Sequence, residues 1–257
     1  MLIAISSLKG ANVEGSDGHV GTVRDFLFDA VTWQIRWMEV DVGSWLHERK
    51  VLIHPSAIAP LKVPERPELA LPMMRSMEEL VLSVGLTKRQ IEESPIIRED
   101  EPITQQIECR VYGHYSWDPH WVRSYFSMHA VGMAASPGQI SVQTNPENTG
   151  PHSVAELFGS HIHATDGDIG HVENLIVDDN KWDIRYMIVA TGNWWPGKHV
   201  LLAPYAVRQV DWLARRVALN VTRAKVRSSP PWDPAAMIDE MNEQHLHAHY
   251  GWPGYGW

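Results

Sequence analysis

The hydrophobic pattern of the chain predicts short strands rather than long helices. Runs rich in β-branched and aromatic residues are separated by Gly- and Asp-containing turns, at the spacing of about 8 to 12 residues that is typical of small barrels and sandwiches. This spacing leaves no room for the crossover helices of a parallel α/β sheet. Within 33–41, apolar side chains occupy both faces. We therefore expect one face of this strand to line a core and the other to meet a second surface.

The same pattern occurs twice. Residues 8–58 align with 157–207 without a gap, at a constant offset of 157 − 8 = 149. Internal similarity at a fixed offset indicates a duplicated structural unit. The matched positions include Asp17-Gly18 with Asp166-Gly167, Gly21 with Gly170, Ile35-Arg36-Trp37 with Ile184-Arg185-Tyr186, and Pro55 with Pro204.

The alignment resumes downstream at a smaller offset. Residues 86–95 match 221–230 at 230 − 95 = 135, so the first copy has an insertion of 149 − 135 = 14 residues. We place it around 75–85 and expect a short helix there, because Ser76 and Glu79 have the capping-box spacing. The predicted organisation is a first repeat with its insert and aromatic tail over 1–121, a linker over 122–156, and a second repeat with an aromatic, His-rich tail over 157–257.

Turn and cap signals set the expected element boundaries. Asp17-Gly18 and Asp166-Gly167 predict two-residue hairpins, and the following Gly21 and Gly170 indicate a bulge or a close backbone approach. Helices are expected only after the strands. Their predicted starts are the capping box Thr87-Lys88-Arg89-Gln90 and the Asp233-Pro234 pair.

Composition excludes several classes of function. The net charge of −9 disfavours nucleic acid, whose binders need a basic face, and anionic membranes. Cys109 is the only cysteine, so neither an intramolecular disulfide nor a Cys-based zinc site is possible. No apolar stretch approaches the roughly 20 residues of a membrane span, and the N-terminus lacks the basic start of a signal peptide. We expect a cytoplasmic protein without a transmembrane segment.

These residues carry a family resemblance. The order Gly10, Asp17-Gly18, Gly21, Ile35-Arg36-Trp37 and Val51-Leu52-Ile53 resembles the PRC-barrel domain. That domain is the β-barrel of the photosynthetic reaction centre H subunit, and it recurs in the ribosome maturation factor RimM and in stand-alone bacterial proteins. The resemblance implies a mainly β fold of two small antiparallel PRC-type barrels in tandem, each followed by short helices and an aromatic tail. It also implies a module that is not an enzyme.

Three functions remain open at this point. The leading hypothesis is an interaction or scaffold module that binds a protein partner or associates with itself, either as a homo-oligomer or by pseudo-twofold pairing of its two copies. The first alternative is a metal-binding or metal-responsive protein. The second, by analogy with RimM, is a factor in RNA or ribosome maturation, which would need a basic patch on one face.

Histidines are the candidate metal ligands. His245, His247 and His249 alternate, as do His161 and His163. On a strand, alternate residues share one face and could offer imidazoles to a divalent transition metal, whereas on a helix they would diverge. The competing interpretation is ordinary polar surface histidine. We expect no other cofactor.

Aromatic residues are the candidate partner contacts, because they dominate interface hot spots. They either anchor a partner or cover the barrel of their own chain, and we favour packing of the tails within the chain. No catalytic motif is present; the recurring Asp residues are interpreted as turn formers, and Cys109 as a buried or inert thiol. The contact candidates are Trp45, Trp194 and Trp195 in predicted loops and Trp252 and Trp257 in the second tail.

Overall fold

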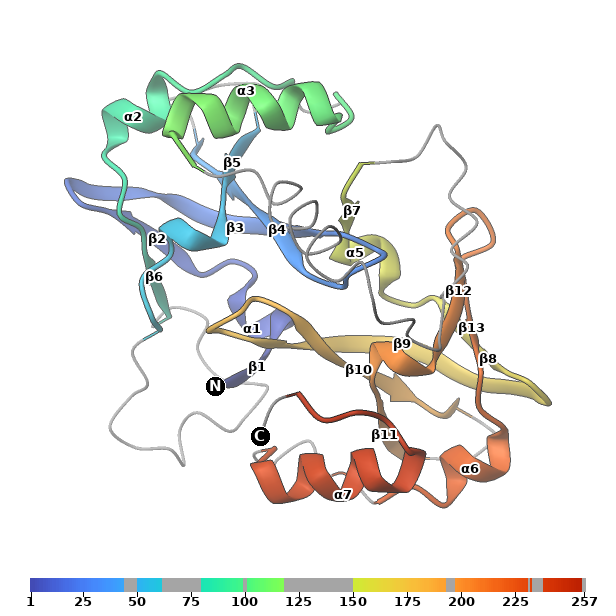
Figure 1. Cartoon of the computed structure of the whole chain (residues 1–257). Coiled ribbons are helices and arrows are strands. Elements are labelled where there is room, and N and C mark those ends of the chain that lie inside the picture. Colours follow the sequence, from blue (N-terminus) through green and yellow to red (C-terminus); the bar gives the residue numbers. More distant parts are fainter. Residues whose placement is uncertain are drawn as a thin grey trace, which may run out of the picture.

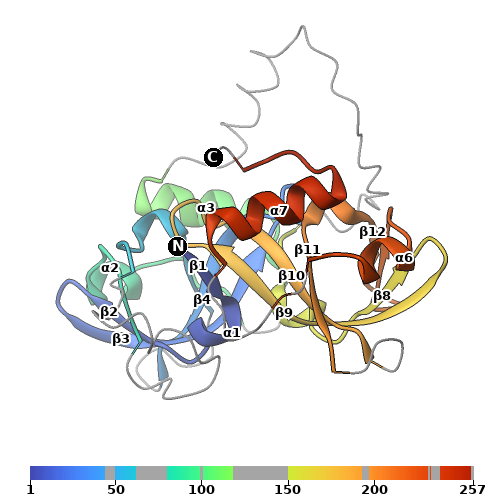
Figure 2. The same ribbon diagram turned by 90° about the horizontal axis from the view of Figure 1, so that it is seen from below.

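The protein is mainly β and consists of two sheets placed side by side, with one long helix on the outer side of each (Figures 1 and 2). The N-terminus lies near the middle of the molecule (Figure 1). The computed structural model describes residues 1–43, 50–61, 80–98, 101–117, 150–192, 197–230, 232 and 238–255.

The two sheets have the same strand order. The first runs β5-β4-β3-β2-β6 and the second runs β11-β10-β9-β8-β13, with β12 added beyond β13. The strands of the first sheet are β2 Asn12–Gly15, β3 Gly18–Phe28, β4 Ile35–Asp41, β5 Val51–Ile53 and β6 Val81–Ser83. Those of the second are β8 His161–Ala164, β9 Gly167–Asp178, β10 Ile184–Ala190, β11 His199–Leu202, β12 Val207–Asp211 and β13 Arg216–Leu219.

Each sheet departs from the antiparallel pattern at one pair. β2 is parallel to β6, and β8 is parallel to β13. The chain returns to the edge beside β2 or β8 after the 3₁₀ turns η2 (Pro55–Ala57) and η5 (Pro204–Ala206). These turns begin at the two prolines that the sequence aligned, where proline ends a ladder because it lacks an N–H donor.

The hairpins form where the sequence predicted them. Gly15 pairs with Gly18 and Ala164 with Gly167, so each loop consists of a Ser-Asp or Thr-Asp pair rather than the Asp-Gly pair itself. Gly170 is required by a close backbone approach, because a Cβ there would lie 1.8 Å from the Ala190 carbonyl oxygen. The expectation for this glycine is confirmed.

The two halves exchange a short strand with each other. β1 (Leu2–Ala4) pairs with β9 of the second sheet, and β7 (His152–Ser153) pairs with β3 of the first. Ala4 lies opposite Ile176 and Ser153 opposite Leu27, positions that are related by the offset 153 − 4 = 149. The exchange is therefore reciprocal, and it relates the halves by a pseudo-twofold axis.

The axis passes between the starts of β4 and β10. Gln34 forms a β-bridge with its own counterpart, Asp183. Trp33 and Trp182 flank this bridge, and their carbonyl oxygens accept the N–H groups of Ile184 and Ile35, both at 2.8 Å. The sequence placed the two tryptophans at strand starts; instead both have a left-handed backbone, with φ of 59° and 58°. That conformation is uncommon outside glycine, and here it aims each carbonyl across the axis.

Both faces of the central strands are buried, as the pattern of 33–41 predicted. One face contributes to a core that runs through both halves. The other meets a helix: α3 (Gln105–Tyr115) covers the first sheet and α7 (Glu240–Tyr250) the second. The second core layer under α3 contains Leu27, Trp37, Leu52, Ile97, Ile103, Ile107, Val111 and Tyr112.

The helices begin at polar caps. Thr87 forms the predicted capping box of α2 (Lys88–Glu92), and Thr222 caps its counterpart α6 (Arg223–Arg227). α7 begins after Asp239 rather than at Asp233-Pro234, a pair that lies outside the described residues. The short helices α1 (Ile5–Leu8) and α5 (Val154–Leu157) follow the exchanged strands. Within the described residues, no helix is long and apolar enough to span a membrane.

The strand register limits where the insertion of the first copy can lie. β6 matches β13 at the offset 216 − 81 = 135, and Ile58 bridges to Val84 as Val207 pairs with Leu219. The extra length therefore falls between Ile58 and Val81, a segment that overlaps the first part of the expected 75–85. The helix expected around Ser76 and Glu79 lies outside the described residues.

Candidate functional site

The most buried charged side chains of the first half lie where α3 packs on its sheet. Glu108 of α3 accepts the indole N–H of Trp37 at 2.6 Å and also bonds the guanidinium of Arg36. The other side of that guanidinium faces Asp29 at 3.5 Å. The Glu108 side chain is only 1% exposed, so this carboxylate holds the helix to β4 from inside the protein.

The second half has the equivalent arrangement under α7. Glu243 accepts Nη2 of Arg185 and the hydroxyl of Tyr186, both at 2.8 Å. Arg185 also pairs with Asp178 at 3.2 Å. Its guanidinium stacks 3.6 Å from the centre of the Tyr255 ring, a cation–π contact that ties the C-terminal tail to the same cluster.

A histidine extends the second cluster. The Nε2 atom of His247 lies 2.9 Å from the Tyr186 hydroxyl, and its Nδ1 lies 2.6 Å from the carbonyl oxygen of Pro253. At the corresponding place the first half has Tyr112, whose ring packs 4.9 Å from Trp37. At this position the second cluster therefore contains an imidazole and the first a tyrosine ring, which is tilted against Trp37 and also contacts the ring of His54.

Burial shifts the ionisation of these groups. It raises the pKa of Glu108, an effect that the Arg36 charge partly opposes. Burial and the hydrogen bond to Glu243 raise the pKa of Tyr186, and burial lowers the pKa of His247. Burial also raises the pKa of Tyr250 to about 12. Each shift disfavours the charged form, as desolvation does.

These two clusters hold α3 and α7 against their sheets. Their carboxylates and guanidinium groups are enclosed by packed side chains, and a buried ion pair requires close geometry because desolvation offsets much of its attraction. An enzyme would need paired titratable groups that face a cleft. Two hollows within the described residues are lined by other side chains.

Sequence reasoning missed both clusters, although a signal was present. Glu108 and Glu243 are related by the offset 243 − 108 = 135, and Arg36 and Arg185 by 185 − 36 = 149. A Glu at the same position of two amphipathic helices, with an Arg at the same position of two buried strands, indicates a conserved pair within the repeat. Only the structure brings the helix and the strand together.

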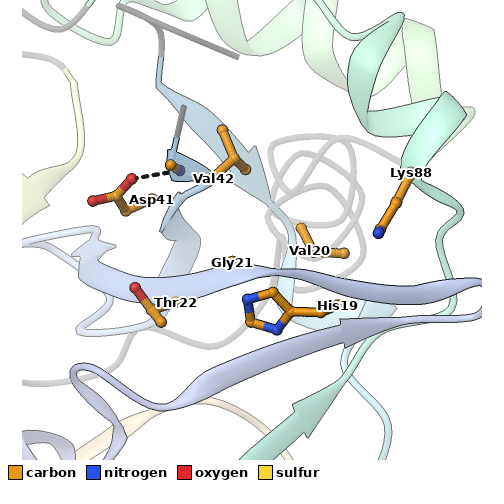
Figure 3. Close-up of a pocket in the computed structure, with 8 residues that line it drawn as sticks. His19, Val20, Gly21, Thr22, Asp41, Val42 and Lys88 are labelled. Carbon is orange, nitrogen blue, oxygen red and sulfur yellow. Dashed lines mark hydrogen bonds between the residues drawn. The ribbon is translucent and has the colours of Figure 1, made fainter. Parts of the chain in front are cut away.

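One hollow lies beside the hairpin of the first half (Figure 3). Asp41 accepts the N–H of Gly43 at 2.8 Å on one side of it, and the Lys88 side chain approaches it from α2. Its lining is His19, Val20, Gly21, Thr22, Asp41, Val42, Gly43 and Lys88. This rim combines one amine, one imidazole and one carboxylate on separate elements, without the mutual hydrogen bonds of a catalytic group.

The three candidate metal ligands of the second tail do not come together. His245, His247 and His249 lie on α7, where alternate residues point in different directions. His245 is exposed, whereas His247 is buried and His249 lies 2.9 Å from the Lys225 carbonyl oxygen. Within the described part of the chain, no group of three or more His, Cys, Asp or Glu side chains is arranged to hold a metal ion.

The candidate partner contacts are only partly described. Trp45, Trp194, Trp195 and Trp257 lie outside the described residues. Trp252 is half-buried and stacks on Tyr250 with ring centres 4.0 Å apart. In the first tail, Trp117 stacks on Tyr115 at 4.2 Å in the same way. The described parts of both tails thus pack within the chain.

Two further side-chain predictions are resolved. Asp17 and Asp166 are turn residues as expected, and each also accepts the first N–H of a helix, at 2.8 Å from Lys88 and 2.7 Å from Arg223. The expectation of a buried thiol is wrong, because Cys109 is exposed on α3. It lies next to Glu108 in sequence, and successive helical residues face different sides.

Comparison with known proteins gives one family. The sequence model of the PRC-barrel domain matches residues 1–63, which include β1 to β5 and η2. PRC-barrel is a non-catalytic domain family. No curated protein is significantly similar to the chain.

Proposed function

We propose that this protein, whose residues 1–63 match the PRC-barrel domain, is a cytoplasmic interaction scaffold that presents two related barrel-type units as one rigid body. The proposal has no catalytic step. The observation that carries it is the reciprocal strand exchange, in which β1 completes the second sheet and β7 completes the first. This geometry fixes the spacing and the orientation of two similar outer surfaces.

The buried polar clusters support a structural use of the charged residues. Arg36 with Glu108, and Arg185 with Glu243, fix the helices on the outer side of each sheet. Ion pairs of this kind specify one arrangement rather than add much stability. A scaffold requires fixed helix positions, because a partner that contacts both halves gains affinity only when the separation of the two contact surfaces is fixed.

Affinity capture tests the proposal. The full chain, immobilised through its C-terminus, is exposed to a lysate of its natural host and the retained proteins are identified by mass spectrometry. We expect a discrete partner whose retention saturates and is competed by the free full chain. A purified complex should then show a fixed stoichiometry by analytical ultracentrifugation. A chain that remains monomeric and retains no saturable partner would contradict the proposal.

A further inference from the structure

The interface between the two halves is built from equivalent pieces of each half. β1 of the first half pairs with β9, and β7 of the second half pairs with β3, at related positions. Phe26 of the first half stacks on Trp182 of the second with ring centres 5.8 Å apart. Such an interface has the design of a twofold dimer, in which a surface can bind a copy of itself. Its geometry alone therefore allows three pairings: first with second, first with first, and second with second.

The polar contacts away from the axis do not decide between these pairings. The Asn174 amide donates to the hydroxyl of Ser6 at 2.6 Å, and the hydroxyl of Ser153 bonds the carboxylate of Asp25. Each half thus supplies one serine and one side chain with acceptor oxygens. Like halves could form similar bonds, so the preference must come from elsewhere.

The axis position is different, because there a residue meets its own counterpart. Gln34 forms a β-bridge with Asp183, and the two are related by 183 − 34 = 149. The amide nitrogen of Gln34 donates to the Lys181 carbonyl oxygen of the other half at 3.3 Å. A pair of two second halves would place Asp183 opposite Asp183. Like charges directly opposite each other on neighbouring strands are destabilising, and a carboxylate has no N–H for the carbonyl oxygen.

The surroundings of Asp183 increase this conflict. The titratable groups around it are Asp178, Lys181, Arg185, Tyr205 and Tyr255. Burial and the nearby Asp178 raise the pKa of Asp183, and the opposing effects of Lys181 and Arg185 do not cancel this shift. Because the charge of one carboxylate is already disfavoured here, a second carboxylate at the axis adds repulsion. The uncharged amide of Gln34 avoids it.

We propose that the interface is selective: a second half pairs with a first half, of its own chain or of a second copy, and Asp183 prevents it from pairing with another second half. Residues 118–149 join the halves and favour pairing within one chain, because a tether raises the local concentration of the partner half. At high chain concentration, exchange of halves between two chains builds a closed dimer with the same interface. The inference rests on the proposed scaffold function and names a second copy of the chain as a partner.

A cut chain tests the selection directly. A recognition site for a sequence-specific protease is inserted between Gly138 and Gln139, so that cleavage yields two pieces of different mass. Light and heavy-isotope batches are cut, unfolded together in urea and refolded by dilution, and native mass spectrometry identifies the pairs. We expect unlike pairs, light–heavy ones included, to exceed pairs of two second halves at least about tenfold. The random proportion, about two to one, would overturn the proposal.

Variants of the intact chain test the axis pair without cutting. Gln34→Asp sets two carboxylates opposite each other, and Gln34→Asn is the control of matched size without the charge. At pH 7 we expect Gln34→Asp to raise the equilibrium constant of unfolding in urea about fivefold relative to Gln34→Asn. This gap should close toward about pH 4, where the carboxylates take up protons. Equal unfolding constants at pH 7 would overturn the role of Asp183, also if the cut pieces do not refold.

Exchanging the two residues across the axis is the matched control. Gln34→Asp combined with Asp183→Gln again leaves one carboxylate and one amide, and should return the unfolding constant to within about twofold of that of the unmodified chain. In the cut chain, Asp183→Gln alone should let second halves pair with one another in the random proportion. A cut Asp183→Gln chain that stays fully selective would overturn the assignment to this residue.

One result separates this inference from the scaffold function. A cut chain that pairs without selection, while the intact chain still captures a saturable partner from the host lysate, would overturn the inference and leave the scaffold function standing.

Discussion

The two halves use one docking principle with different chemistry around it. In the first, Glu108 meets Arg36 and the indole of Trp37, and Tyr112 closes the cluster by ring contact. In the second, the equivalent Glu243 meets Arg185 and Tyr186, and His247 takes the place of the closing ring. The Glu–Arg pair is thus the constant part of the repeat, whereas its neighbours have diverged. The comparison indicates that the Glu–Arg pair fixes where the helix docks. The neighbouring side chains set how the stability of the docked helix changes with pH.

The largest expected effect comes from removing the docking carboxylates. Glu108→Ala or Glu243→Ala leaves a buried guanidinium without its main partner, and breaking a buried pair costs about 3–5 kcal/mol. We expect each variant to lower the free energy of unfolding, measured by urea titration of the far-UV circular dichroism signal. Hydrogen exchange should locate the loss in α3 for Glu108→Ala and in α7 for Glu243→Ala.

A double variant sharpens this prediction. Arg36→Met with Glu108→Leu removes both buried charges and leaves Asp29, which is partly exposed and still accepts the N–H groups of Val31 and Thr32. The loss should therefore be smaller than that of Glu108→Ala. A double variant as unstable as the single one would contradict the role of the charge pair and would attribute the effect to packing alone.

A smaller effect is expected at the close backbone approach that both halves share. A Cβ at Gly21 would lie 2.1 Å from the Asp41 carbonyl oxygen, and one at Gly170 would lie 1.8 Å from that of Ala190. Gly21→Ala and Gly170→Ala should each cost about 1–3 kcal/mol through forced displacement of the backbone, as measured by thermal unfolding. Gly113→Ala is the control, because a Cβ there meets nothing within 4 Å. If Gly170→Ala left the thermal unfolding transition unchanged, β10 would be able to move away from the added Cβ, and this prediction would be wrong.

The smallest effect is a pH response of opposite sign in the two halves. Burial lowers the folded-state pKa of His247, so the unfolded chain takes up the proton first and the stability of α7 falls as the pH drops below about 6.5. Burial raises the pKa of Glu108. Its folded form takes up the proton first, so α3 gains stability as the pH falls through that raised pKa toward the ordinary carboxyl value of about 4.3.

Hydrogen exchange at pH 7 and pH 5, corrected for intrinsic rates, measures this contrast. We expect the protection of α7 to decrease relative to α3 on acidification, and His247→Gln to remove the decrease. Equal changes in the two helices would contradict the different surroundings assigned to the two carboxylates.

Much of the fold is readable from the sequence, because its signals are local. The Asp-containing hairpins, the glycine at the close approach, the capping box at Thr87 and the two-sided burial of 33–41 follow from backbone conformation and from alternation along a strand. α7 begins after Asp239, a cap that the sequence reasoning did not single out, and the Asp233-Pro234 start stays a prediction because it lies outside the described residues.

The candidate sites were less predictable. Whether His245, His247 and His249 can bind one metal ion depends on their secondary structure. They lie on α7, and the helix separates the three imidazoles that a strand would have placed on one face. His161 and His163 alternate in sequence and share one face of β8. Arg216 and His171 join them only through the register of β13 and β9.

By itself the sequence determined the duplication, the mainly β character and the positions of the turns, all of which depend on residues near one another in the chain. Only the tertiary structure decided the rest. In it, β1 and β7 each pair with the sheet of the other half, and Trp33 and Trp182 have a left-handed backbone beside the axis. It also brings two docking pairs into contact, Glu108 with Arg36 and Glu243 with Arg185. The physical reason is that burial and pairing energies act between segments far apart in the chain. Because the two halves have equivalent sheet edges, the sequence does not reveal which strand pairs with which edge. The tertiary structure decides this pairing.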